Sequence, residues 1–338
     1  MNKLTKLGVS ALCGSLAAVS SANAGELTVT GGVDMSWISL SDEVVGNPIG
    51  MGSNLTFSGS GELDNGWGVA LTVAMDNLDA YSNTNVVVTI PAYGDIRIDQ
   101  GTTGTGIDRI DDITPNVWEE AYGTGLGTGI QTVNGGSGGS TIEYTPNMLP
   151  AGITARIAYS PNAAGSNAGD KASSGMSVSP EDSSLEFTVQ ATEDLHGVAG
   201  LTVTVGMSEI EQDATHATID ADEEEETYAI TYAMGGFTVG YQWSEQDLGT
   251  SSGVQMYENE GYGITFSIND DLSVGYNHYE SKQTSTANVT AEATSVQVAY
   301  SMGGASIRIA DSQADNMDYN TGAAYDRDST VISVSLAF

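Results

Sequence analysis

Apolar and polar residues alternate one by one along most of this chain, and no other feature restricts its fold as strongly. Apolar side chains recur in this way at Leu27, Val29, Val33, Met35 and Trp37. Because side chains on a β-strand point alternately to its two faces, a period of two predicts strands with one apolar and one polar face. We count sixteen such segments, at residues 27–37, 55–57, 67–75, 86–90, 96–98, 142–144, 153–159, 185–189, 201–207, 228–232, 237–243, 262–268, 272–276, 296–300, 307–309 and 332–338.

The connections between these segments alternate between short and long. Tight turns occur at residues 64–66, 93–94, 234–236, 269–271 and 302–304, and loops rich in Gly, Ser, Asn and Asp separate them. Short turns at one rim and long loops at the other are typical of outer-membrane barrels. A soluble sandwich shares the alternation but seldom keeps one rim short, and a calcium-binding β-helix needs a short repeat that this chain lacks. The pattern therefore predicts an all-β, 16-stranded antiparallel transmembrane β-barrel.

The first 24 residues have the pattern of an export signal. Lys3 and Lys6 precede an apolar run at residues 7–19, and small residues at positions 22–24 precede Gly25. We therefore predict a signal peptide at 1–24 and a barrel at 25–338. The only cysteine, Cys13, lies in the expected signal peptide, so the remaining chain could form no disulfide. No run of 18 apolar residues occurs elsewhere, which argues against membrane-spanning helices.

The charge of the chain excludes one class of partner. It carries 9 Lys and Arg against 44 Asp and Glu, a formal net charge of −35. Binding to nucleic acid requires a basic surface, and this composition offers too few cations to build one. We therefore expect no nucleic-acid partner.

Two stretches of this sequence resemble a known family. Residues 331–338, VISVSLAF, end on Phe338, and TIEYTP at 141–146 is followed by GITARIAYSP at 152–161. These stretches are similar to the general porins of Gram-negative outer membranes, especially those of alphaproteobacteria. The resemblance implies a homotrimer of passive pores in contact with outer-membrane lipid and lipopolysaccharide. It also implies that the barrel-assembly machinery recognises Phe338 and that the third loop folds into the barrel.

The longest gap between strands in the first half of the chain, residues 101–139, follows the fifth expected strand. This is where the constriction loop of the family begins, so its acids are candidates to line the narrowest part of the pore. These acids are Asp108, Asp111, Asp112, Glu119 and Glu120. The alternative is that they form an ordinary solvated surface.

Three arginines lie between outward-facing apolar residues and must therefore face the lumen, namely Arg97, Arg156 and Arg308. Three are few compared with the arginine-rich constrictions of the family. An excess of acids over arginines predicts a negative potential and a cation-selective pore. The alternative is that each arginine only pairs with a carboxylate of the wall.

Signals for catalysis or metal binding are weak. Residues 135–139 match G-x-S-x-G only within a Gly/Ser tract, and His196, His216 and His278 are far apart in sequence. We therefore expect no enzyme and no cofactor. The acidic run at 220–226 predicts a solvated loop, with bound Ca²⁺ or Mg²⁺, bridging to lipopolysaccharide, as the alternative. The functional expectation is a water-filled channel for small hydrophilic solutes and ions; the alternative is an adhesin-like surface protein without channel activity.

Overall fold

The structure is a computed structural model that describes residues 24–41, 47–77, 83–100, 104–136, 140–163, 181–213, 218–285 and 288–337. Several sequence expectations fall on residues outside these ranges. They concern residues 1–23 of the expected signal peptide, the two ends of the expected constriction loop at 101–103 and 137–139, His216 and the terminal Phe338.

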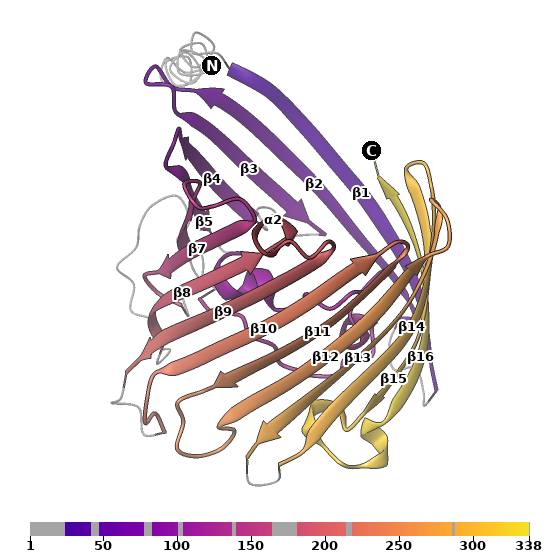
Figure 1. Ribbon diagram of the computed structural model, residues 1–338. Coiled ribbons are helices and arrows are strands. Elements are labelled where there is room, and N and C mark those ends of the chain that lie inside the picture. Colours follow the sequence, from indigo (N-terminus) through magenta and orange to yellow (C-terminus); the bar gives the residue numbers. More distant parts are fainter. Residues whose placement is uncertain are drawn as a thin grey trace, which may run out of the picture.

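The described strands form one closed antiparallel barrel in which sequence neighbours pair and β1 pairs with β16 (Figure 1). The strands are β1 (Ala24–Leu40), β2 (Ile49–Glu62), β3 (Gly68–Asp76), β4 (Asn83–Ile90), β5 (Gly94–Gln100), β6 (Ser140–Pro146), β7 (Ile153–Ser160), β8 (Glu181–Ala191), β9 (Leu201–Gln212), β10 (Glu223–Met234), β11 (Phe237–Asp247), β12 (Met256–Ser267), β13 (Leu272–Thr284), β14 (Thr290–Met302), β15 (Ala305–Asp315) and β16 (Arg327–Ala337). Each of the sixteen predicted segments corresponds to one of these strands, in order. The predicted fold is confirmed.

The faces of the strands are inverted relative to a water-soluble protein. On β8, Leu185 and Phe187 are 43% and 39% exposed, whereas Glu186 and Thr188 are 1% and 2% exposed. The apolar face therefore points outward, where lipid replaces water, and the polar face lines the inside of the barrel.

Tight hairpins close the rim at which β1 begins and β16 ends (Figure 1). The connections β10–β11 and β14–β15 each contain two residues, and their first residues, Gly235 and Gly303, have φ values of 60° and 61°. Glycine adopts this left-handed conformation without a steric penalty. The predicted short turns at 234–236 and 302–304 are therefore present.

Several strands extend beyond the segments that the alternation predicts. β10 begins at Glu223, five residues before Tyr228, so the last four residues of the acidic run at 220–226 belong to a strand. The expectation of a solvated loop is wrong for them: Glu223 and Glu225 are buried in the barrel, and Glu224 and Glu226 are exposed. The apolar pattern stops where the outer face becomes charged, although the backbone ladder continues.

The helices of the described residues are short. They are η1 (Gly106–Ile110), η2 (Ala121–Gly123), α2 (Glu193–His196), η3 (Met317–Tyr319) and η4 (Ala323–Tyr325). None of the helices in the described ranges has the length and apolar character needed to cross a membrane. η1 and η2 belong to the segment between β5 and β6, and the coil of η1 is visible behind β8 and β9 in Figure 1.

Candidate functional site

The segment between β5 and β6, described at residues 104–136, runs along the polar inner face of the barrel. It starts beside β6 and β8, where buried carboxylates accept hydrogen bonds from its backbone. Glu143 accepts from the N–H of Gly106 at 2.9 Å, and Glu186 accepts from the N–H of Ile107 at 2.9 Å. Because these carboxylates are 2% and 1% exposed, the bonds satisfy groups that have little access to water.

Two inward-facing glutamines hold the middle of the segment. Gln242 on β11 accepts from the N–H of Ile113 at 2.7 Å and donates to the carbonyl of Ile110 at 2.8 Å. Gln297 on β14 accepts from the N–H of Trp118 at 3.1 Å and donates to the carbonyl of Glu119 at 2.5 Å. An amide side chain offers both a donor and an acceptor, so one residue can fix two backbone groups.

The segment reaches β15 and then returns. Thr124 donates to Ser312 on β15 at 2.8 Å, and the N–H of Gln131 donates to the hydroxyl of Tyr319 at 3.1 Å. On the way back, Gly135 donates its N–H to Glu225 on β10 at 2.7 Å. These hydrogen bonds attach the segment to the inner face from β6 round to β15, and at Gly125 and Leu126 it also comes close to β1 and β16.

Inward-facing glycines allow this close approach. A Cβ atom on Gly263 would lie 2.2 Å from the carbonyl oxygen of Pro115, and one on Gly240 would lie 2.5 Å from the Pro115 ring. Gly240 and Gly263 face each other on β11 and β12. Glycine inside a strand marks a place where another backbone comes close. These two glycines are therefore a sequence signal for the packed segment, one that the alternation of apolar and polar residues did not provide.

The five acids of the segment lie in two places. Asp108, on η1, accepts a hydrogen bond from the N–H of Gly104. The other four lie between η1 and η2, where each is close enough to another of them to raise its pKa or to share a hydrogen bond with it. They are Asp111, Asp112, Glu119 and Glu120.

These carboxyl groups titrate at higher pH than isolated acids. Burial raises the pKa of Asp111 to about 9, and the charge of Asp112 adds to the shift. Burial likewise raises the pKa of Glu120 to about 7. Asp112 and Glu119 are the most exposed of the four, but burial inside the barrel still raises both of their pKa values. At neutral pH, Asp111 is therefore mainly protonated and shares a hydrogen bond with Asp112, so the pair is not fully ionised.

Two of the three predicted arginines have carboxylate partners on the wall. Arg97 on β5 donates through Nε to Asp99 at 2.8 Å and through Nη1 to the carbonyl of Gly104 at 3.3 Å. Arg308 on β15 donates to Asp34 on β1 at 3.1 Å. This pairing corresponds to the alternative in which arginines act as scaffold, and it reduces their positive field in the lumen.

Arg156 and Arg109 lie near each other, and Glu143, the partner of Arg109, stands opposite Arg97 in the pairing of β5 with β6. Arg156 is on β7, and no hydrogen bond or salt bridge joins its guanidinium group to another residue within the described ranges. Arg109, the only basic residue at positions 101–139, lies on η1 and forms a 2.6 Å salt bridge with Glu143. Sequence reasoning did not select Arg109, because its partner is 34 residues away and only the fold joins them.

A group of possible metal ligands lies on the outer face of the barrel. One ligand atom each from His278, Glu280 and Glu292 falls within 4.8 Å of the others. Nε2 of His278 is 3.1 Å from Glu280, and its Nδ1 is 2.8 Å from the hydroxyl of Thr294. The pairing of β13 with β14 creates this group by setting Glu280 opposite Glu292, and the spacing of the histidines in sequence gave no sign of it.

Comparison with known proteins identifies the family. A family model described as Gram-negative porin matches residues 8–335. The anion-selective porin from Comamonas acidovorans has the same fold, with a TM-score of 0.65 and 14% identity over 93% of this chain and 100% of that one. A porin structure refined at 1.8 Å resolution has a TM-score of 0.64 and 14% identity, with the same coverage of both chains. Outer-membrane-expressed OmpT of Vibrio cholerae has a TM-score of 0.63 and 14% identity over 93% of this chain and 98% of that one.

No curated protein matches the chain. At 14% identity the solved structures establish the fold alone, whereas the family model spans nearly the whole sequence. The closed barrel, whose strands turn their apolar face outward, agrees with the match to the porin family. The chain belongs to the Gram-negative porins, which are outer-membrane channels for small solutes.

Proposed function

We propose that this porin is a passive, water-filled pore for small hydrophilic solutes, narrowed by residues 101–139 and selective for cations. The observation that carries the proposal is the carboxyl group cluster of Asp111, Asp112, Glu119 and Glu120 on a segment bound to the inner face. A barrel of sixteen strands encloses a water-filled channel, so a segment bound inside it reduces the free cross-section.

The balance of charge supports cation selectivity. Arg109 is paired with Glu143, Arg97 with Asp99 and Arg308 with Asp34, so three of the four arginines described above have a carboxylate neighbour. The unpaired excess is acidic and creates a negative potential that raises the local concentration of cations. One neighbour in fold is described as an anion-selective porin, the opposite selectivity to the one proposed for this chain.

The assembly of the pore is also a proposal. The resemblance to general porins supports a homotrimer, contact with lipid and lipopolysaccharide, and recognition of Phe338 by the barrel-assembly machinery. A Ca²⁺ or Mg²⁺ ion held by Asp220 and Asp222 would link the acidic run at 220–226 to lipopolysaccharide phosphates. Calorimetry with Mg²⁺ on the purified protein tests this ion, and no heat of binding would argue against it.

Recordings in planar lipid bilayers test the main proposal. Purified protein should insert with a defined conductance and close in three equal steps, as expected for a trimer of pores. Liposome swelling should show permeation of small sugars. If the purified, folded barrel gave neither conductance nor swelling, the proposal would fail and the surface-protein alternative would be favoured.

A further inference from the structure

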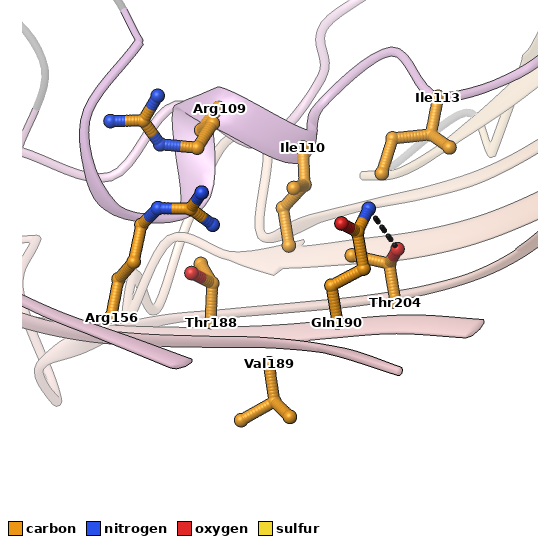
Figure 2. Close-up of a pocket in the computed structure, with 8 residues that line it drawn as sticks. All are labelled: Arg109, Ile110, Ile113, Arg156, Thr188, Val189, Gln190 and Thr204. Carbon is orange, nitrogen blue, oxygen red and sulfur yellow. Dashed lines mark hydrogen bonds between the residues drawn. The ribbon is translucent and has the colours of Figure 1, made fainter. Parts of the chain in front are cut away.

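A cavity of about 210 Å³ lies between η1 and the inner face of β7 to β9 (Figure 2). Arg109, Ile110 and Ile113 line it from the segment, and Arg156, Thr188 and Gln190 line it from the strands. Since these strands face the lumen with their polar side, the cavity would open to the water-filled interior of the pore.

The guanidinium groups of Arg109 and Arg156 lie near one end of this cavity. In Figure 2, the side chain of Arg156 rises from β7 toward Arg109 on η1. The whole chain has only 9 Lys and Arg, so two of them in one cavity is a marked local excess. Glu143 neutralises one of the two through its salt bridge with Arg109, which leaves about one positive charge facing the cavity.

The same end contains buried hydrogen-bonding groups without partners. Nε of Arg109 and Oγ1 of Thr188 are buried, and neither has a hydrogen-bond partner among the described residues. Thr188 is 2% exposed. A buried polar group without a partner destabilises a protein, so an unpaired donor beside two guanidinium groups indicates that a ligand acceptor belongs there.

The opposite end and the roof of the cavity differ in character. Ile110 and Ile113 form an apolar roof, and the amide of Gln190 is turned toward Thr204, to which it donates at 3.4 Å. A bound molecule would thus meet cationic donors at one end and aliphatic carbon along its length.

We propose that this cavity is a binding site for small aliphatic monocarboxylates. Guanidinium groups bind carboxylates through paired N–H donors, the hydroxyl of Thr188 supplies a further donor, and the single net positive charge matches one carboxylate. The two isoleucines contact the alkyl chain. The inference rests on the proposed pore only for access, because the ligand reaches the cavity through the lumen.

Equilibrium binding to the purified, folded barrel tests the site. Sodium butyrate is titrated into wild-type protein and followed by saturation-transfer NMR, with butyramide as the uncharged analogue and inorganic phosphate as the anion without a chain. Butyrate should bind more tightly than both. Equal binding of butyramide would overturn the role of the arginines, and tighter binding of phosphate would overturn the assignment to carboxylic acids.

Three variants refine the test. Arg156→Gln should weaken butyrate binding at least tenfold, and Thr188→Val should weaken it severalfold. Lys282→Gln is the matched control, since it removes one positive charge from the outer face, 3.6 Å from Glu258, and should leave binding unchanged. Heat-modifiable mobility in gels verifies folding of each variant, and unchanged butyrate binding in folded Arg156→Gln would refute the site.

Conductance measured on the same preparations separates this inference from the proposed function. Wild-type protein that conducts but does not bind butyrate would refute the carboxylate site and leave the pore intact. Protein that binds butyrate in the manner described but does not conduct would refute the pore and keep the site.

Discussion

Raising the pH from 5 to 9 should make the pore more selective for cations. The pKa of Glu120 is raised to about 7 and that of Asp111 to about 9, so both acids are mainly protonated at pH 5. At pH 9, Glu120 is almost fully ionised and Asp111 about half ionised, a gain of roughly one and a half negative charges.

The size of the effect follows from Coulomb's law. A cation that passes about 5 Å from one carboxylate in water gains about 0.8 kcal/mol, which screening in 0.1 M salt reduces to about 0.5 kcal/mol. An anion loses the same amount. For about one and a half charges, the preference for K⁺ over Cl⁻ should change by about 1.5 kcal/mol, or roughly tenfold.

Reversal potentials in a KCl gradient measure this change directly. Glu120→Gln should remove the rise in cation selectivity that is centred near pH 7 and keep the rise in cation selectivity near pH 9. Asp270→Asn, in the exposed turn between β12 and β13, is the control and should keep the wild-type profile. A permeability ratio that stays constant from pH 5 to 9, or a Glu120→Gln profile identical to that of wild type, would refute the reasoning.

Three further predictions concern the segment and assembly. Shortening residues 102–137 should raise single-channel conductance severalfold and admit larger sugars, because the obstruction is lost while the wall remains; an unchanged conductance in the folded variant would contradict this. Gly263→Val should displace the segment, since a Cβ there would lie 2.2 Å from the Pro115 oxygen, and should alter conductance, whereas Gly59→Val, whose nearest contact is 3.8 Å, should not. Equal conductance in both variants would argue against the packing described. Phe338→Asp should reduce heat-modifiable barrel in the outer membrane by about tenfold or more; normal amounts would disprove the assembly role.

The fold could be predicted from sequence because each strand carries its own signal. Lipid on one side and water on the other impose alternation residue by residue, so the sixteen segments appear without knowledge of their partners. The ends of strands could not be predicted where the outer face turns polar. The start of β10 at Glu223 is the clearest case, since its glutamates resemble a loop when taken alone.

The site could be predicted only in outline. Position after the fifth strand identified the segment and its acids, but its attachment depends on contacts between distant residues, such as Ile113 with Gln242 and Arg109 with Glu143. The protonation of Asp111 also depends on burial that only the fold creates. Composition therefore overstates the charge of the segment at neutral pH.

The sign of ion selectivity tests the central claim most directly. In a KCl gradient at pH 7.5, the wild-type reversal potential should have the sign of a cation-selective pore. The double variant Asp111→Asn with Asp112→Asn should move it toward zero, and by more at pH 9 than at pH 6. A potential of the anion-selective sign, or one that the double variant leaves unchanged at both pH values, would contradict the proposal that these carboxyl groups govern permeation.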